Sequence, residues 1–219
     1  MVTLNDIKKD LLVISYRKKA DEYLERIGYT EHGDRHSNVV AKNASNILCK
    51  LGRPEREEEL AGIAGYLHDI GNVVSREDHA QTGAILAEKI LSRLDMDIDE
   101  ISEVMMAIGN HEEADGYPVS DVTAALIIAD KADVHRSRVR TLEFIKFDIH
   151  DRVNYAAKKS FLKVNQKNRT ITLSIEIDTK ISPVMEYFEI FLSRMVISRR
   201  AAEFLGCTFE LIINGTKII

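Results

Sequence analysis

Apolar residues recur at three- and four-residue spacing through the first two thirds of the chain, a periodicity typical of amphipathic helices. Glycines follow several of these segments, at positions where helices commonly end. The pattern predicts helices over 4–27, 35–51, 55–69, 76–94, 99–109, 121–140 and 148–159.

The pattern changes near residue 160. Residues 161–165 and 170–177 are rich in strand-forming residues, and the second segment alternates apolar with polar positions. The short polar connection between them fits a hairpin. A helix over 183–205, a strand over 207–213 and a turn at Asn214-Gly215 follow, which together predict a ββαβ unit.

We therefore predict a mainly α protein in two parts, a helical domain over 1–159 and a small α+β tail over 160–219. The tail is too small to be expected to be stable alone. Its helix carries a broad apolar face, which predicts either a homodimer interface or a cover for a pocket of the first domain. No histidine follows His150, so we expect the tail to supply no chemistry.

Composition narrows the function classes. The chain has 219 residues, of which 45% are hydrophobic and 30% charged, as in ordinary globular proteins. Its net charge of -5 argues against an extended nucleic-acid surface. The longest apolar run, Ala124 to Ala129, is far too short for a membrane span, and the N-terminus shows no signal-peptide pattern. Cys49 and Cys207 are expected to be reduced thiols, and we expect a cytoplasmic protein.

Histidines and aspartates occur together at helix ends. His68-Asp69 closes an apolar helix and is followed by Ile70-Gly71, an arrangement that can project both side chains into a cleft. Taken alone, His68 could equally interact with the carbonyls at a helix C-terminus. His36 lies in the first turn of another helix, where a solvated or capping histidine would also fit.

Asp130 is the most informative of these residues. It follows the run Ala-Ala-Leu-Ile-Ile-Ala, so its carboxylate emerges from a helix that should be mostly buried. A buried carboxylate is costly unless it is paired or bound to a metal. Lys131 cannot be its whole partner, because adjacent helix residues point in different directions. A cation held by the histidines would serve.

Two further histidines extend the set. His79 lies in the first turn of its helix, and His111 follows Gly109-Asn110 at a helix end. Either could be an ordinary exposed residue. Taken with the earlier residues, they form a mixed set of nitrogen and oxygen donors that suits Mn, Fe, Co, Ni or Zn.

The order of these motifs resembles the HD superfamily of metal-dependent phosphohydrolases. The family's order of His, then His-Asp, then a distant Asp is matched by His36, His68-Asp69 and Asp130. The local sequences YLHDIGN, HAQTGA and IIADKAD are also similar to family segments, and the resemblance covers about residues 30–140. It implies an HD-type helical bundle that hydrolyses a phosphate ester or anhydride through metal-activated water. A nucleotide is the expected substrate.

Two branches with additional histidines are similar to this chain: small proteins that cleave dinucleoside polyphosphates, and the HD-GYP phosphodiesterases. The chain departs from the second branch. Asn72 replaces a lysine, Asn110 precedes His111 where that branch has a second histidine, and Asp115-Gly116-Tyr117-Pro118 matches its signature only in part. These departures argue against cyclic-di-GMP as substrate and against a trinuclear centre.

The resemblance assigns the roles. His36, His68, Asp69 and Asp130 would bind one divalent ion, and Asp69 would also orient the attacking water. His79 and His111 would either bind a second ion, bridged by Asp69, or contact phosphate. Arg35, Arg76 and Lys131 are candidate substrate-binding residues, by sequence proximity alone.

Two other functional hypotheses compete with a phosphohydrolase. The first is a nucleotide-sensing module that keeps an HD-like metal site but has little turnover. The second is a purely structural helical protein, which leaves Asp130 and the adjacent His68-Asp69 unexplained, because buried ionisable groups usually need a partner.

Overall fold

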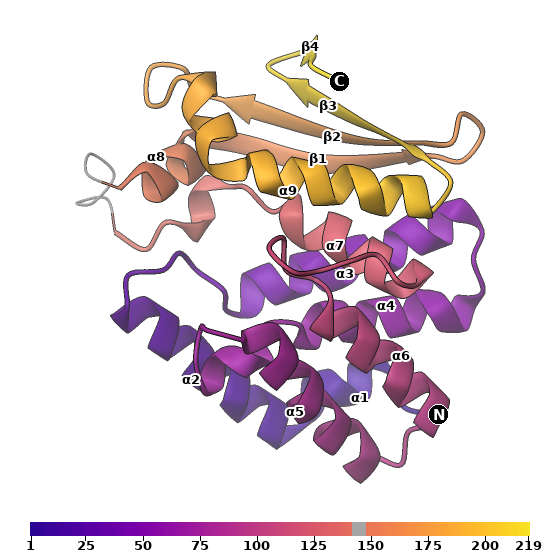
Figure 1. The fold of residues 1–219 in the computed structure, drawn as a ribbon. Coiled ribbons are helices and arrows are strands. Elements are labelled where there is room, and N and C mark those ends of the chain that lie inside the picture. Colours follow the sequence, from indigo (N-terminus) through magenta and orange to yellow (C-terminus); the bar gives the residue numbers. More distant parts are fainter. Residues whose placement is uncertain (142–147) are drawn as a thin grey trace.

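The helices form a bundle beneath a small sheet, and α9 lies between them (Figure 1). The computed structural model describes residues 1–141 and 148–219. The helices are α1 (Leu4–Lys9), α2 (Leu11–Arg26), α3 (Asp34–Leu51), α4 (Glu55–Leu67), α5 (His79–Arg93), α6 (Ile98–Gly109), α7 (Asp121–Lys131), α8 (Ile149–Ala156) and α9 (Val184–Phe204), with 3-10 turns η1 (Ile70–Val73) and η2 (Arg136–Arg138). The strands are β1 (Ala157–Asn165), β2 (Thr170–Ile177), β3 (Thr208–Ile213) and β4 (Thr216–Lys217).

The predicted helices are confirmed, but several boundaries differ. The predicted helix 4–27 is divided at Asp10, whose carboxylate accepts hydrogen bonds from the backbone N–H groups of Leu12 and Val13 and so begins α2. The predicted helix 121–140 ends at Lys131, and the side chain of His135 then caps the separate turn η2. Side-chain capping of this kind competes locally with a continuous helix.

A close helix crossing sets the position of the C-terminal end of α4. A Cβ atom on Gly65 would lie 2.8 Å from Cα of Ala41 in α3, which is closer than real contacts allow. The glycine therefore lets α4 approach the backbone of α3 directly. This approach brings the residues after α4, His68 and Asp69, beside His36 at the start of α3.

The tail has the predicted ββαβ order, extended by β4. The strands lie in the order β1-β2-β3-β4, with β1 and β2 antiparallel, β2 and β3 parallel, and β3 and β4 antiparallel. The α9 crossover joins the two parallel strands, as parallel pairing requires. The sheet begins at Ala157, before the predicted boundary at residue 160, because the predicted helix 148–159 ends at Ala156.

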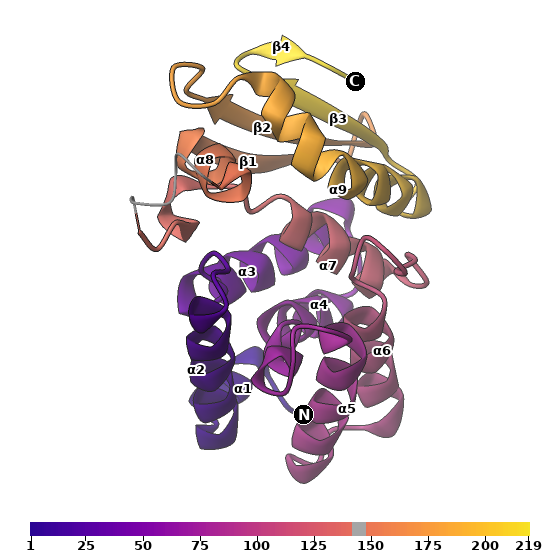
Figure 2. The ribbon, with the colours of Figure 1, turned by 60° about the vertical axis from the view of Figure 1, so that its left-hand side comes forward.

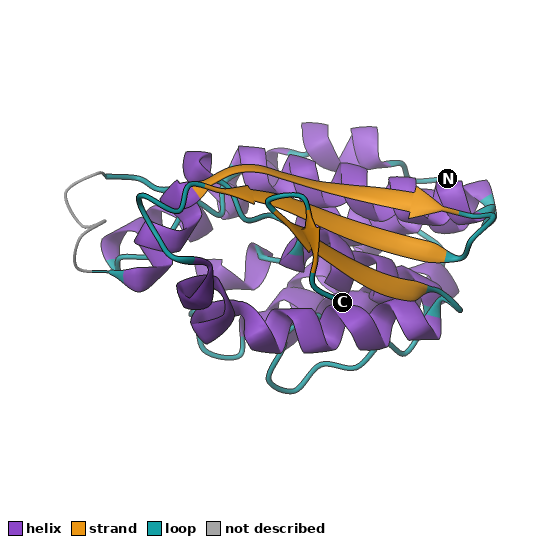
Figure 3. Ribbon diagram, turned by 90° about the horizontal axis from the view of Figure 1, so that it is seen from above, coloured by secondary structure: helices purple, strands orange, loops and turns teal. Residues whose placement is uncertain are grey.

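The broad apolar face of α9 contacts two neighbours. Phe191 and Met195 are buried in one continuous hydrophobic cluster that includes residues of the sheet and of α7. Viewed after a turn, α9 lies between the strands and α7 (Figure 2). From above, the sheet covers the helices (Figure 3). The apolar surface of α9 is thus largely used within the chain, although Met185 and Leu192 stay exposed.

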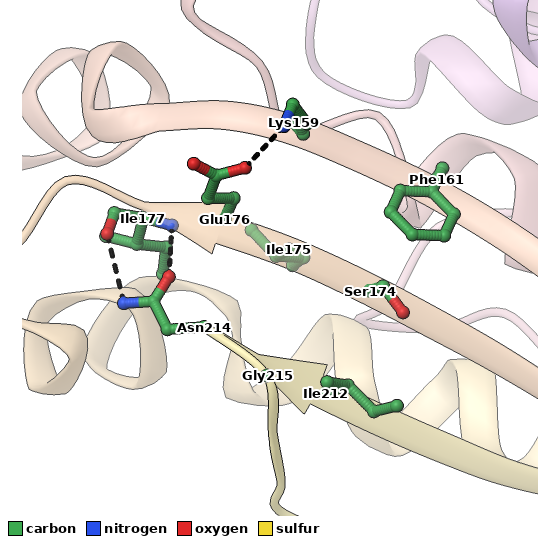
Figure 4. A pocket seen from close by; sticks show the side chains of 9 residues that line it. All are labelled: Lys159, Phe161, Ser174, Ile175, Glu176, Ile177, Ile212, Asn214 and Gly215. Atoms are coloured by element: carbon green, nitrogen blue, oxygen red, sulfur yellow. Dashed lines mark hydrogen bonds and ion pairs between the residues drawn. The ribbon is translucent and has the colours of Figure 1, made fainter.

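The outer face of the sheet carries a shallow hollow of about 630 Å³. Lys159 and Glu176 form an ion pair there, and Asn214 exchanges hydrogen bonds with the backbone of Ile177 (Figure 4). None of the predicted site residues lines this hollow. Within the described ranges, no helix is long and apolar enough to cross a membrane.

Candidate metal centre

The fold gathers the predicted ligands from five helices into one buried cluster. His36 is in the first turn of α3, and His79 is the first residue of α5. His68 and Asp69 directly follow α4, and His111 follows the end of α6. Asp130 comes from the last turn of α7. All six are buried, with exposed fractions between 0% and 8%.

A shared hydrogen-bond pattern orients the histidines. In three of them, the ring Nδ1 donates to the backbone carbonyl three residues earlier. Because a carbonyl can only accept, Nδ1 carries a proton, and Nε2 is the ring nitrogen that remains to face the cluster. The three pairs are His68 with Gly65 at 2.9 Å, His79 with Arg76 at 3.1 Å and His111 with Ile108 at 2.6 Å.

His36 reaches the same state through a carboxylate. Its Nδ1 lies 2.7 Å from Oδ2 of Asp133. Asp133 is in turn held by two hydrogen bonds of 2.8 Å from the guanidinium of Arg35. A carboxylate that orients a ligand histidine is a common supporting arrangement in metal sites. Arg35, predicted to bind substrate, is thus engaged in fixing the cluster.

The first group of donors contains His36, His68 and Asp130. Nε2 of His36 lies 3.3 Å from Nε2 of His68 and 3.3 Å from Oδ1 of Asp130. One ligand atom from each residue lies within 4.8 Å of the others, so the three could hold a metal ion. Asp69 completes the group, because its Oδ2 lies 3.2 Å from Nε2 of His68.

A second group contains His79, His111 and Glu112, which also lie within ligand range of one another. Oε1 of Glu112 is 3.2 Å from Nε2 of His79 and 3.8 Å from Nε2 of His111. Asp69 lies between the two groups, since its other oxygen, Oδ1, is 3.6 Å from Nε2 of His79. A carboxylate in this position can bridge two ions.

Two atoms in the cluster are suited to binding a cation. Oδ2 of Asp69 and Nε2 of His111 are buried and make no hydrogen bond. A buried acceptor without a partner is costly, and native structures rarely keep one without a reason. Both atoms are acceptors, so a proton donor or a metal ion would satisfy them. Imidazole nitrogens and carboxylate oxygens are the donors that divalent transition metals take.

The comparison with known families agrees with this geometry. Residues 33–137 match the HD domain family. Over this range, which is just under half of the chain, the protein is similar to HD domains. The predicted resemblance is therefore confirmed, as is the mainly helical fold with a small α+β tail. The matched range contains all six predicted ligands, and the family and the cluster together support a metal-dependent hydrolase.

Two relatives extend the comparison. The uncharacterized protein MJ1020 of Methanocaldococcus jannaschii is 34% identical over 148 residues, which span 57% of this chain and 56% of that protein. The chain thus matches little more than half the length of this relative. The chain is also similar to a crystal structure of a predicted HD superfamily hydrolase from an uncultured Thermotogales bacterium, with 26% sequence identity and a TM-score of 0.45. The alignment covers 61% of this chain and 75% of the chain in the crystal structure.

Burial and neighbouring charges shift the pKa values of several residues in the cluster. Burial would raise the pKa of the Asp69 and Asp130 carboxyls. The charge of His68 holds the pKa of Asp69 well below its usual range, and the charge of Lys131 does the same for Asp130. Burial would likewise lower the pKa of His68, yet the two carboxylates raise it to about 10. Burial and the neighbouring charges of His68 and Lys131 lower the pKa of His111 to about 4. His111 is therefore neutral at neutral pH.

The three predicted substrate-binding residues lie in different surroundings. Lys131 is 2% exposed, and its Nζ contacts Asp130 at 2.7 Å and Glu113 at 2.6 Å. Arg35 is held by Asp133. Arg76 lines a cleft beside the cluster, and its Nη1 donates to Nε2 of His79 at 3.1 Å.

Four residues that shape the cluster were not predicted from the sequence. Glu112 belongs to the second donor group, and Asp133 orients His36. Asn72 donates to both the backbone and the carboxylate of Asp69 at 2.9 and 3.0 Å, which fixes that residue. Arg138, which donates to the backbone carbonyl of Asp133, is 2% exposed. A signal existed for Asp133, which follows Asp130 by one helical turn.

The proton on His68 predicts how metal binding depends on pH. Because the pKa of His68 is raised to about 10, an ion that takes its Nε2 must displace one proton at any pH between about 6 and 9. His111, with its lowered pKa, contributes none. We expect release of about one proton for the first ion bound, and an affinity that rises with pH. Calorimetric titration with Mn²⁺ in two buffers of different ionisation enthalpy measures this number directly.

A His68→Gln variant serves as the control, since it removes the titrating group and should bind more weakly with no proton release. Binding to the unaltered protein without proton release would contradict the assignment of His68 as a ligand.

Proposed function

We propose that the protein hydrolyses a phosphate ester or anhydride of a small substrate, in particular of a nucleotide, by means of metal-activated water. The observation that carries the proposal is the buried convergence of imidazole Nε2 atoms and carboxylates, with Asp69 between the two donor groups. When bound there, a divalent transition metal such as Mn, Fe, Co, Ni or Zn lowers the pKa of water and offsets charge on phosphoryl oxygens.

Each residue of the first group then has a role. His36, His68, Asp69 and Asp130 would hold the ion, with Asp133 and the carbonyl of Gly65 keeping the two rings in position. Asp69 would also accept a hydrogen bond from the attacking water and so orient it. Asn72 supports this role, because it fixes the carboxylate from the side of η1.

One or two ions can be accommodated by these donors. Glu112 adds a carboxylate to His79 and His111 and so favours a second ion. The guanidinium of Arg76 competes for the same place, because it donates to Nε2 of His79 and lies 3.4 Å from Glu112. In the alternative, Arg76 with His79 and His111 contacts the phosphate directly.

A nucleotide-sensing module with little turnover remains the competing proposal, since the same donors would bind metal and phosphate without catalysis. Turnover separates the two. The cytoplasmic location and the homodimer stay predictions.

Asp69→Ala should abolish hydrolysis, with a loss of at least about a hundredfold in kcat/KM and a lower metal content, because it removes both a ligand and the group that orients water. A panel of phosphorylated compounds with Mn²⁺, Fe²⁺, Co²⁺ and Ni²⁺ measures turnover, and elemental analysis measures the metal. His135→Asn is the matched control, since asparagine can still cap η2. Retained turnover in Asp69→Ala would exclude the role given to this residue.

Glu112→Gln and His111→Ala should distinguish one ion from two. If both residues hold a second ion, either change lowers the metal content by about one ion per chain and removes most activity. If they contact phosphate, the metal content stays and KM or kcat changes instead. A variant that is unchanged in both respects would remove these residues from the site.

A further inference from the structure

A second feature lies beside the metal centre. A cleft of about 420 Å³ is formed by the turn between α2 and α3, by η2, and by the helices α8 and α9. Arg76 connects the cleft to the cluster, because it lines the cleft and donates to Nε2 of His79. The volume falls in the range of small-molecule sites.

Arginines supply hydrogen-bond donors to the lining of this cleft. Arg138 lines it although its side chain is almost fully buried. Its Nε donates to the carbonyl of Glu31 and its Nη1 to that of Asp133, each at 3.0 Å. Among the described residues its Nη2 has no hydrogen-bond partner, which leaves N–H groups for an anion. Arg194 lies on the opposite wall, stacked 4.5 Å over Phe191.

The part of the cleft on α8 presents acceptors. Asn154 is 5% exposed, and its Nδ2 donates to the carbonyl of His150 at 2.9 Å. The carbonyl can only accept, so the remaining atom is Oδ1, which is buried and has no partner. Asp151, one turn away, also lines the cleft, and in the described parts of the chain its carboxylate has no hydrogen-bond or ion-pair partner.

We propose that this cleft receives the organic part of the phosphorylated substrate, and that Asp151 and Asn154 select substrates by accepting hydrogen bonds from hydroxyl or amino groups on that part. The inference rests on the proposed function. Phosphate oxygens would face Arg76 and Arg138 near the metal centre, and the donor-bearing group would face α8. Unsatisfied acceptors discriminate strongly against a ligand that lacks the matching donor.

The proposal also gives the tail a role. Phe191 and Arg194 belong to α9, so the tail forms one wall of the cleft. Of the two predicted roles for residues 160–219, pocket cover is the one that this arrangement favours.

The test compares substrates that differ in their donors. Mn²⁺-loaded, full-length Asp151→Asn and Asn154→Leu are assayed with adenosine 5′-monophosphate, inosine 5′-monophosphate, ribose 5-phosphate and p-nitrophenyl phosphate. We expect kcat/KM for donor-bearing substrates to fall about tenfold or more, as for a lost hydrogen bond to a buried or charged group. The value for p-nitrophenyl phosphate, whose organic part has no donor, should change less than about twofold. Glu189→Gln, an exposed carboxylate on α9, is the matched control.

The pattern of losses identifies the donor. Equal losses for both nucleotides and the sugar phosphate assign the contact to sugar hydroxyls, and a loss confined to adenosine 5′-monophosphate assigns it to the base amino group. Equal losses on all four substrates, or none, in variants that keep their metal and circular dichroism would overturn the proposal.

A binding measurement tests the cleft separately if no hydrolysis is detected. If the unaltered protein hydrolyses none of the four compounds, calorimetric binding of adenosine 5′-monophosphate to the Mn²⁺-loaded proteins decides. Weaker binding to Asp151→Asn than to the unaltered protein would keep the cleft inference while phosphohydrolysis fails. Equal binding, or no binding to either, would overturn it.

Discussion

The hydrogen bonds that fix each histidine Nδ1 are the constraint on which the candidate site depends. Three go to a carbonyl three residues earlier and one to Asp133, so four buried rings present Nε2 toward one volume. A divalent transition metal would bind these nitrogens together with the carboxylates of Asp69 and Asp130. The fold therefore brings the donors of a metal site together at this point.

The rest of the chain serves this arrangement. The close approach at Gly65 places the end of α4 against the start of α3, and α7 supplies Asp130 and, just beyond its end, Asp133. Lys131 links Asp130 to Glu113, which Arg194 of α9 contacts at 3.3 Å. The tail is thus connected to the metal centre by a chain of charges as well as by the apolar core.

Much of this could be predicted from the sequence. The six predicted ligands form one cluster, as the motif order that the chain shares with the HD superfamily implies. Contacts across the fold could not be predicted in the same way. Arg35 lies next to His36 in the sequence, yet it reaches Asp133, and Arg138 is buried by a turn that replaces the predicted end of a helix. Glu112 gave no signal of its own, since an acidic residue in a loop is usually solvated.

The central claim is that these side chains bind a metal together. The most direct measurement is anomalous X-ray diffraction at the absorption edge of the metal, from crystals of protein loaded with Mn²⁺ or Zn²⁺. The account predicts a peak about 2.0–2.2 Å from Nε2 of His36 and of His68 and from oxygens of Asp69 and Asp130. No peak there at full metal loading, or a peak bound only by residues outside this cluster, would contradict it.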